Sequence, residues 1–274
     1  MKNLFWLGAA MLLITACGND DPAPAAVDEA APITDVVETP AIAEPEEDAV
    51  LEVVEESASE PEPEEQAIML AQADTAAPPQ EWQFKENQHF VRLVPTQPTV
   101  GGADKIEVAE FFWYGCPHCY DFERHINGWA DNKPANVRFV RIPATWNRGL
   151  ELHAQLYYTE EVLAANGTIK EPAAFRDAVF AEYHRRGNRL GSKEAIQTLF
   201  ARFDVSADDF ERAWSSFEVN QKMRVASDLA RRYGIANVPA VVVNGKYRTG
   251  GAEAGSYDAL LNVIDELVTR EELN

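Results

Sequence analysis

The spacing of apolar and polar residues predicts two strands near the start of an ordered region that begins at about Trp82. Residues 88–94 have the pattern of an edge strand, and residues 105–114 that of a central strand. Side chains alternate between the two faces of a strand. One face of the second strand therefore carries Ile106, Val108, Glu110, Phe112 and Tyr114. Because Glu110 lies in line with apolar residues, we expect its carboxylate to be buried.

A helix is predicted to begin at Pro117, since the first helical position does not need the N–H that proline lacks. Behind it, apolar or weakly polar residues recur at spacings of three and four, the pattern of a helix face that packs inward. These residues are Cys119, Phe122, Ile126 and Trp129. We therefore expect Cys119 to face the core and Cys116 to lie at the N-terminal edge of the helix.

The remaining pattern predicts a further strand at 137–142, a long helical stretch at about 149–233, and a hairpin. The hairpin joins residues 240–243 to about 246–249 through Asn244-Gly245, a strong turn signal. A last helix carries an apolar side made of Leu260, Leu261, Ile264, Leu267 and Val268. This order of elements predicts an α/β sheet with an inserted all-helical subdomain.

Charge is concentrated in one segment of the chain. Residues 18–80 contain 18 acidic residues, nine prolines and no Lys or Arg, whereas residues 81–274 contain 27 acids and 23 bases. A segment of this composition cannot bury enough apolar surface to offset its ordering entropy, so we interpret residues 17–81 as a disordered tether. The formal net charge of −21 argues against nucleic acid as a partner, because phosphate binding needs clustered Lys and Arg.

The N-terminus has the features of a secretory signal. Lys2 precedes an apolar run, Leu4 to Ile14, that is too short to span a bilayer. The sequence Ile14-Thr15-Ala16-Cys17 resembles a bacterial lipobox. That resemblance implies a signal peptide of residues 1–16 and a lipid-modified Cys17. The alternative is an ordinary cleaved signal with an incidental cysteine, and on either interpretation the protein is exported.

Cys116 and Cys119 form a Cys-x-x-Cys motif at the start of the predicted helix. Unpaired N–H groups and the positive end of the helix dipole favour a thiolate at Cys116, and His118 adds positive charge or a hydrogen bond. A stabilised thiolate is a nucleophile and a good leaving group, and it makes the disulfide form an oxidant. A zinc site would need two further ligands that no second motif supplies, so we expect no metal and no cofactor.

The segment from Glu110 to Glu123, with Cys-Pro-His-Cys at its centre, resembles the active-site segment of the DsbA family of disulfide oxidoreductases. The resemblance covers about residues 84–274 and implies a thioredoxin-like fold with a helical insertion. We expect this domain to comprise residues 82–274, since the ordered region begins at about Trp82. It also implies a cis-proline at Val238-Pro239 beside the cysteines, where an extended substrate would pair with the backbone. Glu110 matches the family's buried acid, whose implied role is to move protons to and from Cys119. A partly exposed Glu110 paired to a lysine on a neighbouring strand is the alternative.

Two residues depart from the pattern of the better-known members. Gly115 precedes the first cysteine, where bulk is often found, and Asn237 replaces the glycine often seen before Val-Pro.

The resemblance predicts an oxidase in the periplasm, tethered to a membrane by N-terminal lipidation. Its implied partners are exported proteins with cysteines, and a quinone-linked membrane oxidase resembling DsbB that regenerates the disulfide. A reductase or isomerase that uses the same cysteine pair is a second hypothesis. A third is a peptide-binding envelope lipoprotein or chaperone in which redox chemistry is secondary.

Overall fold

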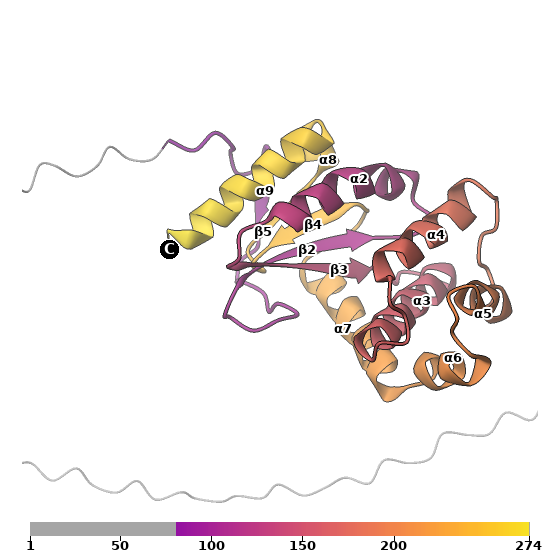
Figure 1. Cartoon of the computed structure of the whole chain (residues 1–274). Coiled ribbons are helices and arrows are strands. Elements are labelled where there is room, and N and C mark those ends of the chain that lie inside the picture. The colour runs from indigo at the N-terminus through magenta and orange to yellow at the C-terminus, as the bar shows by residue number, and fades with distance from the viewer. Residues whose placement is uncertain (1–80, 274) are drawn as a thin grey trace, which may run out of the picture. The chain divides into compact units, whose positions relative to one another are not determined.

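Five strands form one mixed sheet in the computed structural model, which describes residues 81–273 (Figure 1). Their order across the sheet is β1-β5-β4-β2-β3, with β2 and β3 parallel and the other neighbours antiparallel. The strands are β1 (Val91–Arg92), β2 (Ile106–Phe112), β3 (Val137–Pro143), β4 (Ala240–Val243) and β5 (Tyr247–Gly250). The central position predicted for the strand at 105–114 is confirmed by β2. The predicted edge strand is confirmed but shorter, because only Val91 and Arg92 pair in register with β5.

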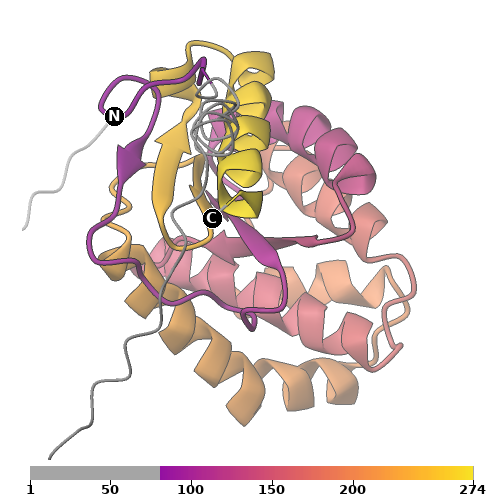
Figure 2. The same cartoon turned by 90° about the vertical axis from the view of Figure 1, so that its left-hand side faces the viewer.

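Helices cover both faces of this sheet. Figures 1 and 2 show α2 and α9 side by side on one face, and the core on that side joins β2 and β4 to the inner surfaces of both helices. The core on the other side includes residues of α3 and α7. The helices are α2 (Pro117–Asn132), α3 (Arg148–Ala165), α4 (Pro172–His184), α5 (Lys193–Ala201), α6 (Ala207–Trp214), α7 (Phe217–Arg232), α8 (Gly251–Ala254) and α9 (Tyr257–Glu272).

The predicted helical insertion is confirmed as α3 to α7, which runs from Arg148 to Arg232. Short polar residues start most of its helices by accepting hydrogen bonds from otherwise unpaired N–H groups. Asn147, Ser192, Ser206 and Ser216 cap α3, α5, α6 and α7 in this way. The caps therefore set the helix boundaries of the insertion, and its apolar core is continuous with the face of the sheet that carries Ala109, Phe111 and Ala240.

The β4–β5 hairpin turns at the predicted residues. Asn244 and Gly245 both have positive φ, 51° and 62°, as a two-residue hairpin turn of the favoured type requires. A side chain at Gly245 would lie 2.1 Å from the carbonyl oxygen of Gln97, so only glycine fits there. The hairpin positions the segment before β4, which carries Val238 and Pro239.

Within residues 81–273, no helix has both the length and the apolar character needed to cross a bilayer. The signal peptide predicted for residues 1–16, Cys17 and nearly all of the tether predicted for residues 17–81 lie outside the described residues.

Candidate active site

The end of β2 and the start of α2 place the two cysteines. The chain turns between Trp113 and Cys116, whose N–H donates to the Trp113 carbonyl oxygen at 3.0 Å. Cys116 is the N-cap of α2, with extended backbone angles, and Pro117 is the first helical residue. Cys116 is 8% exposed and Cys119 is fully buried, whereas Pro117 and His118 between them are exposed. The side chains therefore point as the sequence predicted.

Both sulfur atoms are free thiols, and the surroundings of Cys116 favour its ionised form. Its Sγ accepts a hydrogen bond from the N–H of Cys119 at 3.4 Å and lies 3.5 Å from the carbonyl oxygen of Val238. The Cys119 thiol, which donates to Cys116 Sγ, makes the largest contribution in lowering the pKa of Cys116 to about 6. Partial burial opposes this shift, while the N–H groups of Cys119 and His118 and the charge of His118 add to it. The sequence predicted the helix start and His118, but not the dominant contribution of Cys119.

Cys119 has the opposite environment. Burial raises the pKa of its thiol far above the ordinary value, and the hydrogen bond to Cys116 and the nearby charge of Glu110 raise it further. The pair is therefore asymmetric, with one sulfur that ionises easily and one that holds its proton.

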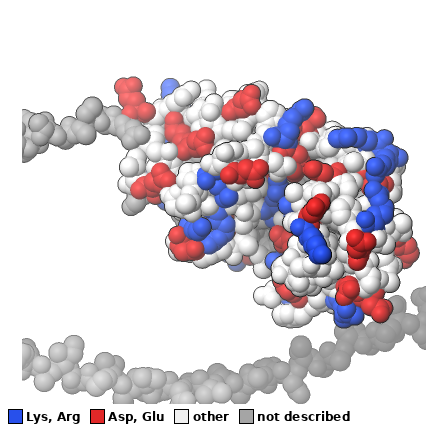
Figure 3. All heavy atoms as spheres, viewed as in Figure 1, with Lys and Arg blue, Asp and Glu red and all other residues white. Residues whose placement is uncertain are grey.

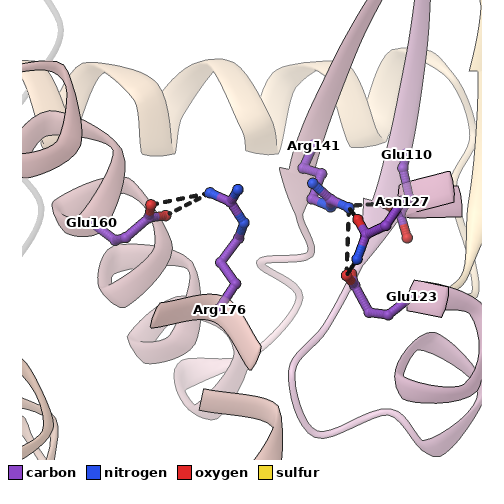
Figure 4. A network of polar contacts seen from close by, with 6 residues as sticks. All are labelled: Glu110, Glu123, Asn127, Arg141, Glu160 and Arg176. Atoms are coloured by element: carbon purple, nitrogen blue, oxygen red, sulfur yellow. Dashed lines mark hydrogen bonds and ion pairs between the residues drawn. The ribbon is translucent and has the colours of Figure 1, made fainter. Parts of the chain in front are cut away.

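A largely buried polar network joins β2 and β3 to α2 (Figure 4). Glu110 on β2 is fully buried, as the sequence predicted, and accepts a hydrogen bond from Arg141 Nε at 3.1 Å. Arg141 lies opposite Glu110 on β3 and also reaches Glu123 and Asn127 on α2. Burial raises the pKa of Glu110 to about 8 although the charge of Arg141 opposes the shift. The partner is thus an arginine rather than the lysine of the alternative hypothesis, and Glu110 is buried as well as paired.

One oxygen of Glu110 is available for a proton. Oε2 faces Arg141, whereas Oε1 has no hydrogen-bond partner among the described residues. A carboxyl group that is buried, lacks a second partner and has a pKa near neutrality is suited to accept or donate a proton.

The segment before β4 lies against Cys116. The Val238–Pro239 bond is cis, as the family resemblance implied. A cavity beside this segment is lined by His118, Asn237, Val238, Pro239, Gly251, Ala252, Glu253, Gly255, Ser256 and Tyr257. Tyr257 also donates to the backbone oxygen of His118 at 2.9 Å. The structure thus brings Glu110, Cys116, Cys119 and Val238 together at one end of the sheet.

Comparison with known proteins gives a consistent result for this region. The family described as "DSBA-like thioredoxin domain" matches residues 107–265. The thiol:disulfide interchange protein DsbA of Azotobacter vinelandii is 38% identical over 187 residues, which cover 68% of this chain and 84% of that protein. The corresponding protein of Pseudomonas syringae is 37% identical over the same shares of the two chains. The crystal structure of Pseudomonas aeruginosa DsbA superposes with a TM-score of 0.64 at 34% identity, covering 69% of this chain and 95% of that one.

The chain belongs to the DsbA family. Its fold is the thioredoxin-like fold with a helical insertion, and it is a disulfide-forming thiol:disulfide oxidoreductase.

Aromatic and histidine side chains around the DsbA motif were not predicted as part of the site. His184 lies 2.8 Å from the Tyr114 carbonyl oxygen through its Nε2 and stacks on Tyr120, and the Tyr120 hydroxyl accepts from Arg185. These contacts join α4 to both sides of the cysteine pair. His184 has no local motif, and only its place at the end of α4 brings it to the site, so periodicity along the sequence could not reveal it.

Gly115, one of the two departures from the better-known DsbA pattern, has a steric explanation. The indole ring of Trp113 lies across it, and a side chain at Gly115 would come within 2.3 Å of that ring. The bulk often found before the first cysteine is thus supplied by Trp113.

Proposed function

We propose that this DsbA-family protein oxidises cysteine pairs of exported proteins, with Cys116 as the sulfur that exchanges with the client. A client thiolate attacks Sγ of Cys116 in the Cys116–Cys119 disulfide, and the electron pair of the broken S–S bond passes to Cys119. A second client thiolate then attacks the client sulfur of the mixed disulfide, and Cys116 departs as a thiolate. The client gains a disulfide and the protein gains two electrons. The lowered pKa of Cys116 supports this assignment, because a low-pKa thiol leaves faster.

We assign Glu110 the role of proton donor and acceptor for Cys119. When Cys119 is released as a thiolate in a buried site, its high pKa demands a proton. Glu110 has a pKa of about 8 and is therefore largely protonated at neutral pH, with Oε1 available for the transfer. Arg141 holds the carboxyl group in place through Oε2.

The backbone of Val238 is the proposed docking point for the client chain. Its carbonyl oxygen is 3.5 Å from Cys116 Sγ, and regular pairing of the adjacent strand begins only at Ala240. An extended peptide that adds to this edge would bring its cysteine to the reactive sulfur.

Alkylation of the reduced protein as a function of pH tests the proposed direction of the reaction. At pH 6 about half of Cys116 would be ionised, against roughly 0.3% of a cysteine with a pKa of about 8.5. Intrinsic nucleophilicity falls with pKa, so the net gain in rate with iodoacetamide is about tenfold. We expect the rate to titrate with a midpoint near pH 6, with mass mapping locating the label on Cys116.

The lowered pKa of Cys116 also predicts how strongly the disulfide form of the protein oxidises other thiols. A lowered thiol pKa stabilises the reduced protein at pH values above the pKa of an unfolded cysteine, and this contribution is lost as pH falls through about 6. The disulfide is therefore a stronger oxidant at neutral pH than an unperturbed one. A midpoint near pH 8.5, together with a glutathione equilibrium as reducing as thioredoxin's, would instead indicate a reductase.

We further propose that the protein works in the periplasm, anchored through lipid-modified Cys17, and that a quinone-linked membrane oxidase resembling DsbB regenerates its disulfide. The lipobox-like sequence and the acidic segment of residues 18–80 support a tethered form. Replacing Cys17 by serine is expected to move the protein from the detergent phase to the aqueous phase in a detergent partition experiment. Retention of the variant in the detergent phase would contradict the lipid anchor.

A further inference from the structure

A second cavity lies between the active-site loop and the helical insertion, away from the segment that carries Val238. Its volume is about 840 Å³. Its lining includes Trp113, Arg148, His153, Tyr183, Arg189 and Lys193. None of the contacts described above for the exchange reaction uses it.

Aromatic side chains form its inner wall and are held by hydrogen bonds. Trp113 Nε1 donates to Nδ1 of His153 at 3.0 Å, and Nε2 of His153 lies 3.1 Å from the carbonyl oxygen of Arg189. His153 is 4% exposed, and burial lowers its pKa, so the neutral ring that this arrangement requires is favoured. Tyr183 packs edge-on against both Trp113 and His153. The wall is therefore preformed.

Three cationic side chains line the cavity. Arg148 and Arg189 are exposed, and Lys193 is half-buried. The Arg189 guanidinium lies over the Tyr183 ring at 5.8 Å, and the Lys193 ammonium over the Trp214 ring at 5.9 Å.

Two carboxylates offset part of this positive charge. Glu151 lines the cavity, and Glu211 pairs with Lys193. Within residues 81–273 neither Arg148 nor Arg189 forms an ion pair with a carboxylate, and Figure 3 shows Lys and Arg gathered over the end of α4 and the loop to α5. The local excess of positive charge contrasts with a chain whose formal net charge is −21.

The side chain of Trp113 lies between the cavity and the loop that carries the reactive cysteine. One edge of the indole lies across Gly115, the neighbour of Cys116, and the same ring lines the cavity. An extended chain advances about 3.3 Å per residue, so three to five residues beyond the exchanging cysteine span roughly 10 to 17 Å.

We propose that this cavity is a client subsite that takes an acidic segment carrying an aromatic side chain, with the ring against Trp113 and the carboxylates facing Arg148 and Arg189. The inference rests on the proposed function, since the client is held at Cys116. Carboxylates pair well with the planar guanidinium group, and aromatic rings pack edge-to-face with one another. The subsite selects among clients, whereas the cysteine pair performs the exchange.

Two reduced dithiol peptides that differ only in one segment test the proposal. One peptide carries Asp-Phe-Asp and the other carries Asn-Phe-Asn, in each case three to five residues from a cysteine. Each peptide is made in two versions, with the segment on the N-terminal or on the C-terminal side of that cysteine. The measurement is the second-order rate constant for reduction of the oxidised full-length protein. We expect the acidic peptide to react about tenfold faster at low ionic strength in one of the two placements, and the ratio to fall in about 0.5 M NaCl. The chain's overall negative charge acts against this preference.

Two variants locate the effect. Arg148→Gln with Arg189→Gln is expected to bring the ratio of the two rate constants close to one. Lys85→Gln with Lys105→Gln removes the same charge from exposed positions that do not line the cavity and is expected to leave the ratio unchanged. Dithiothreitol has neither a carboxylate nor an aromatic ring for the subsite to bind, so its oxidation is expected to be equal in all three proteins.

The outcomes separate the two proposals. Equal rates for the acidic and neutral peptides, or a ratio that survives the Arg148/Arg189 substitutions, would overturn the subsite while normal dithiothreitol oxidation leaves the exchange function standing. Failure to oxidise dithiothreitol would refute the proposed function, and the subsite with it.

Discussion

Replacing Cys116 by serine is expected to reduce the rate of thiol–disulfide exchange by on the order of a thousandfold or more, because the sulfur that forms the mixed disulfide is removed. Replacing Cys119 by serine is expected to have a different result. Cys116 can still attack a client disulfide, but no neighbouring thiol resolves the product, so mixed disulfides accumulate. Non-reducing electrophoresis and mass spectrometry with a disulfide-containing peptide distinguish the two outcomes.

These variants also separate the enzyme from the peptide-binding hypothesis. Both substitutions change one sulfur to oxygen and nearly keep the size of the side chain, so the fold is expected to persist, and thermal unfolding measures the cost of burying the hydroxyl. A Cys116→Ser protein that still promoted disulfide formation in clients would show that the activity lies elsewhere, and a chaperone-like role would then be favoured.

Replacing Glu110 by glutamine is expected to slow the steps in which Cys119 gains or loses its proton, by about a hundredfold, as typical of a lost general acid–base group. Glutamine keeps the size of the side chain and can still accept a hydrogen bond from Arg141, but it cannot transfer a proton at this pH. Single-turnover oxidation of a reduced peptide, measured between pH 6 and pH 8, is the appropriate assay. Alkylation of Cys116 should change little, because Glu110 is not among the groups that lower the pKa of Cys116.

The same substitution has a thermodynamic signature. Burial raises the pKa of Glu110 from the unfolded value of about 4.5 to about 8, so the folded state binds more protons than the unfolded state between these values. The free energy of unfolding contributed by this group therefore falls as pH rises from about 4.5 to 8. Glu110→Gln removes this dependence, so its stability relative to the parent protein is expected to increase between pH 5 and pH 8 in urea unfolding.

Glu160 provides a matched control for Glu110. It is also fully buried and pairs with an arginine, Arg176, and burial raises its pKa to about 7 (Figure 4). It is not among the groups that shift the pKa of either cysteine. Glu160→Gln should therefore alter the pH dependence of stability without slowing exchange. Equal slowing by both substitutions would assign the effect to general disturbance of the core rather than to proton transfer by Glu110.

Local patterns in the sequence were sufficient for the elements that carry the cysteines. Alternation along β2 predicted a buried Glu110, and the three- and four-residue spacing in α2 predicted an inward Cys119. Both depend only on residues close in the chain. The Asn244-Gly245 turn was predictable for the same reason, because its backbone angles are set by the residues themselves.

Contacts between distant segments could not be predicted in this way. The pairing of Glu110 with Arg141 depends on the register of β3 against β2, which no single strand specifies. The hydrogen bond from Trp113 to His153 joins residues 40 positions apart and needs the insertion to fold back on the active-site loop. The hydrogen bond from the Cys119 thiol to Cys116 Sγ is local, but it depends on the rotamers of both cysteines, which the spacing of residues does not specify.

Pro117 and His118 are exposed at the surface, whereas the two cysteines that flank them are buried. Their side chains contribute little to the packed interior, whereas the electric field at the neighbouring sulfur includes the charge of His118. Amino-acid exchanges at these two positions can therefore adjust the driving force for electron transfer while the protein keeps its shape. In a randomised library at this dipeptide, we expect most clones to remain soluble and to differ mainly in oxidising strength.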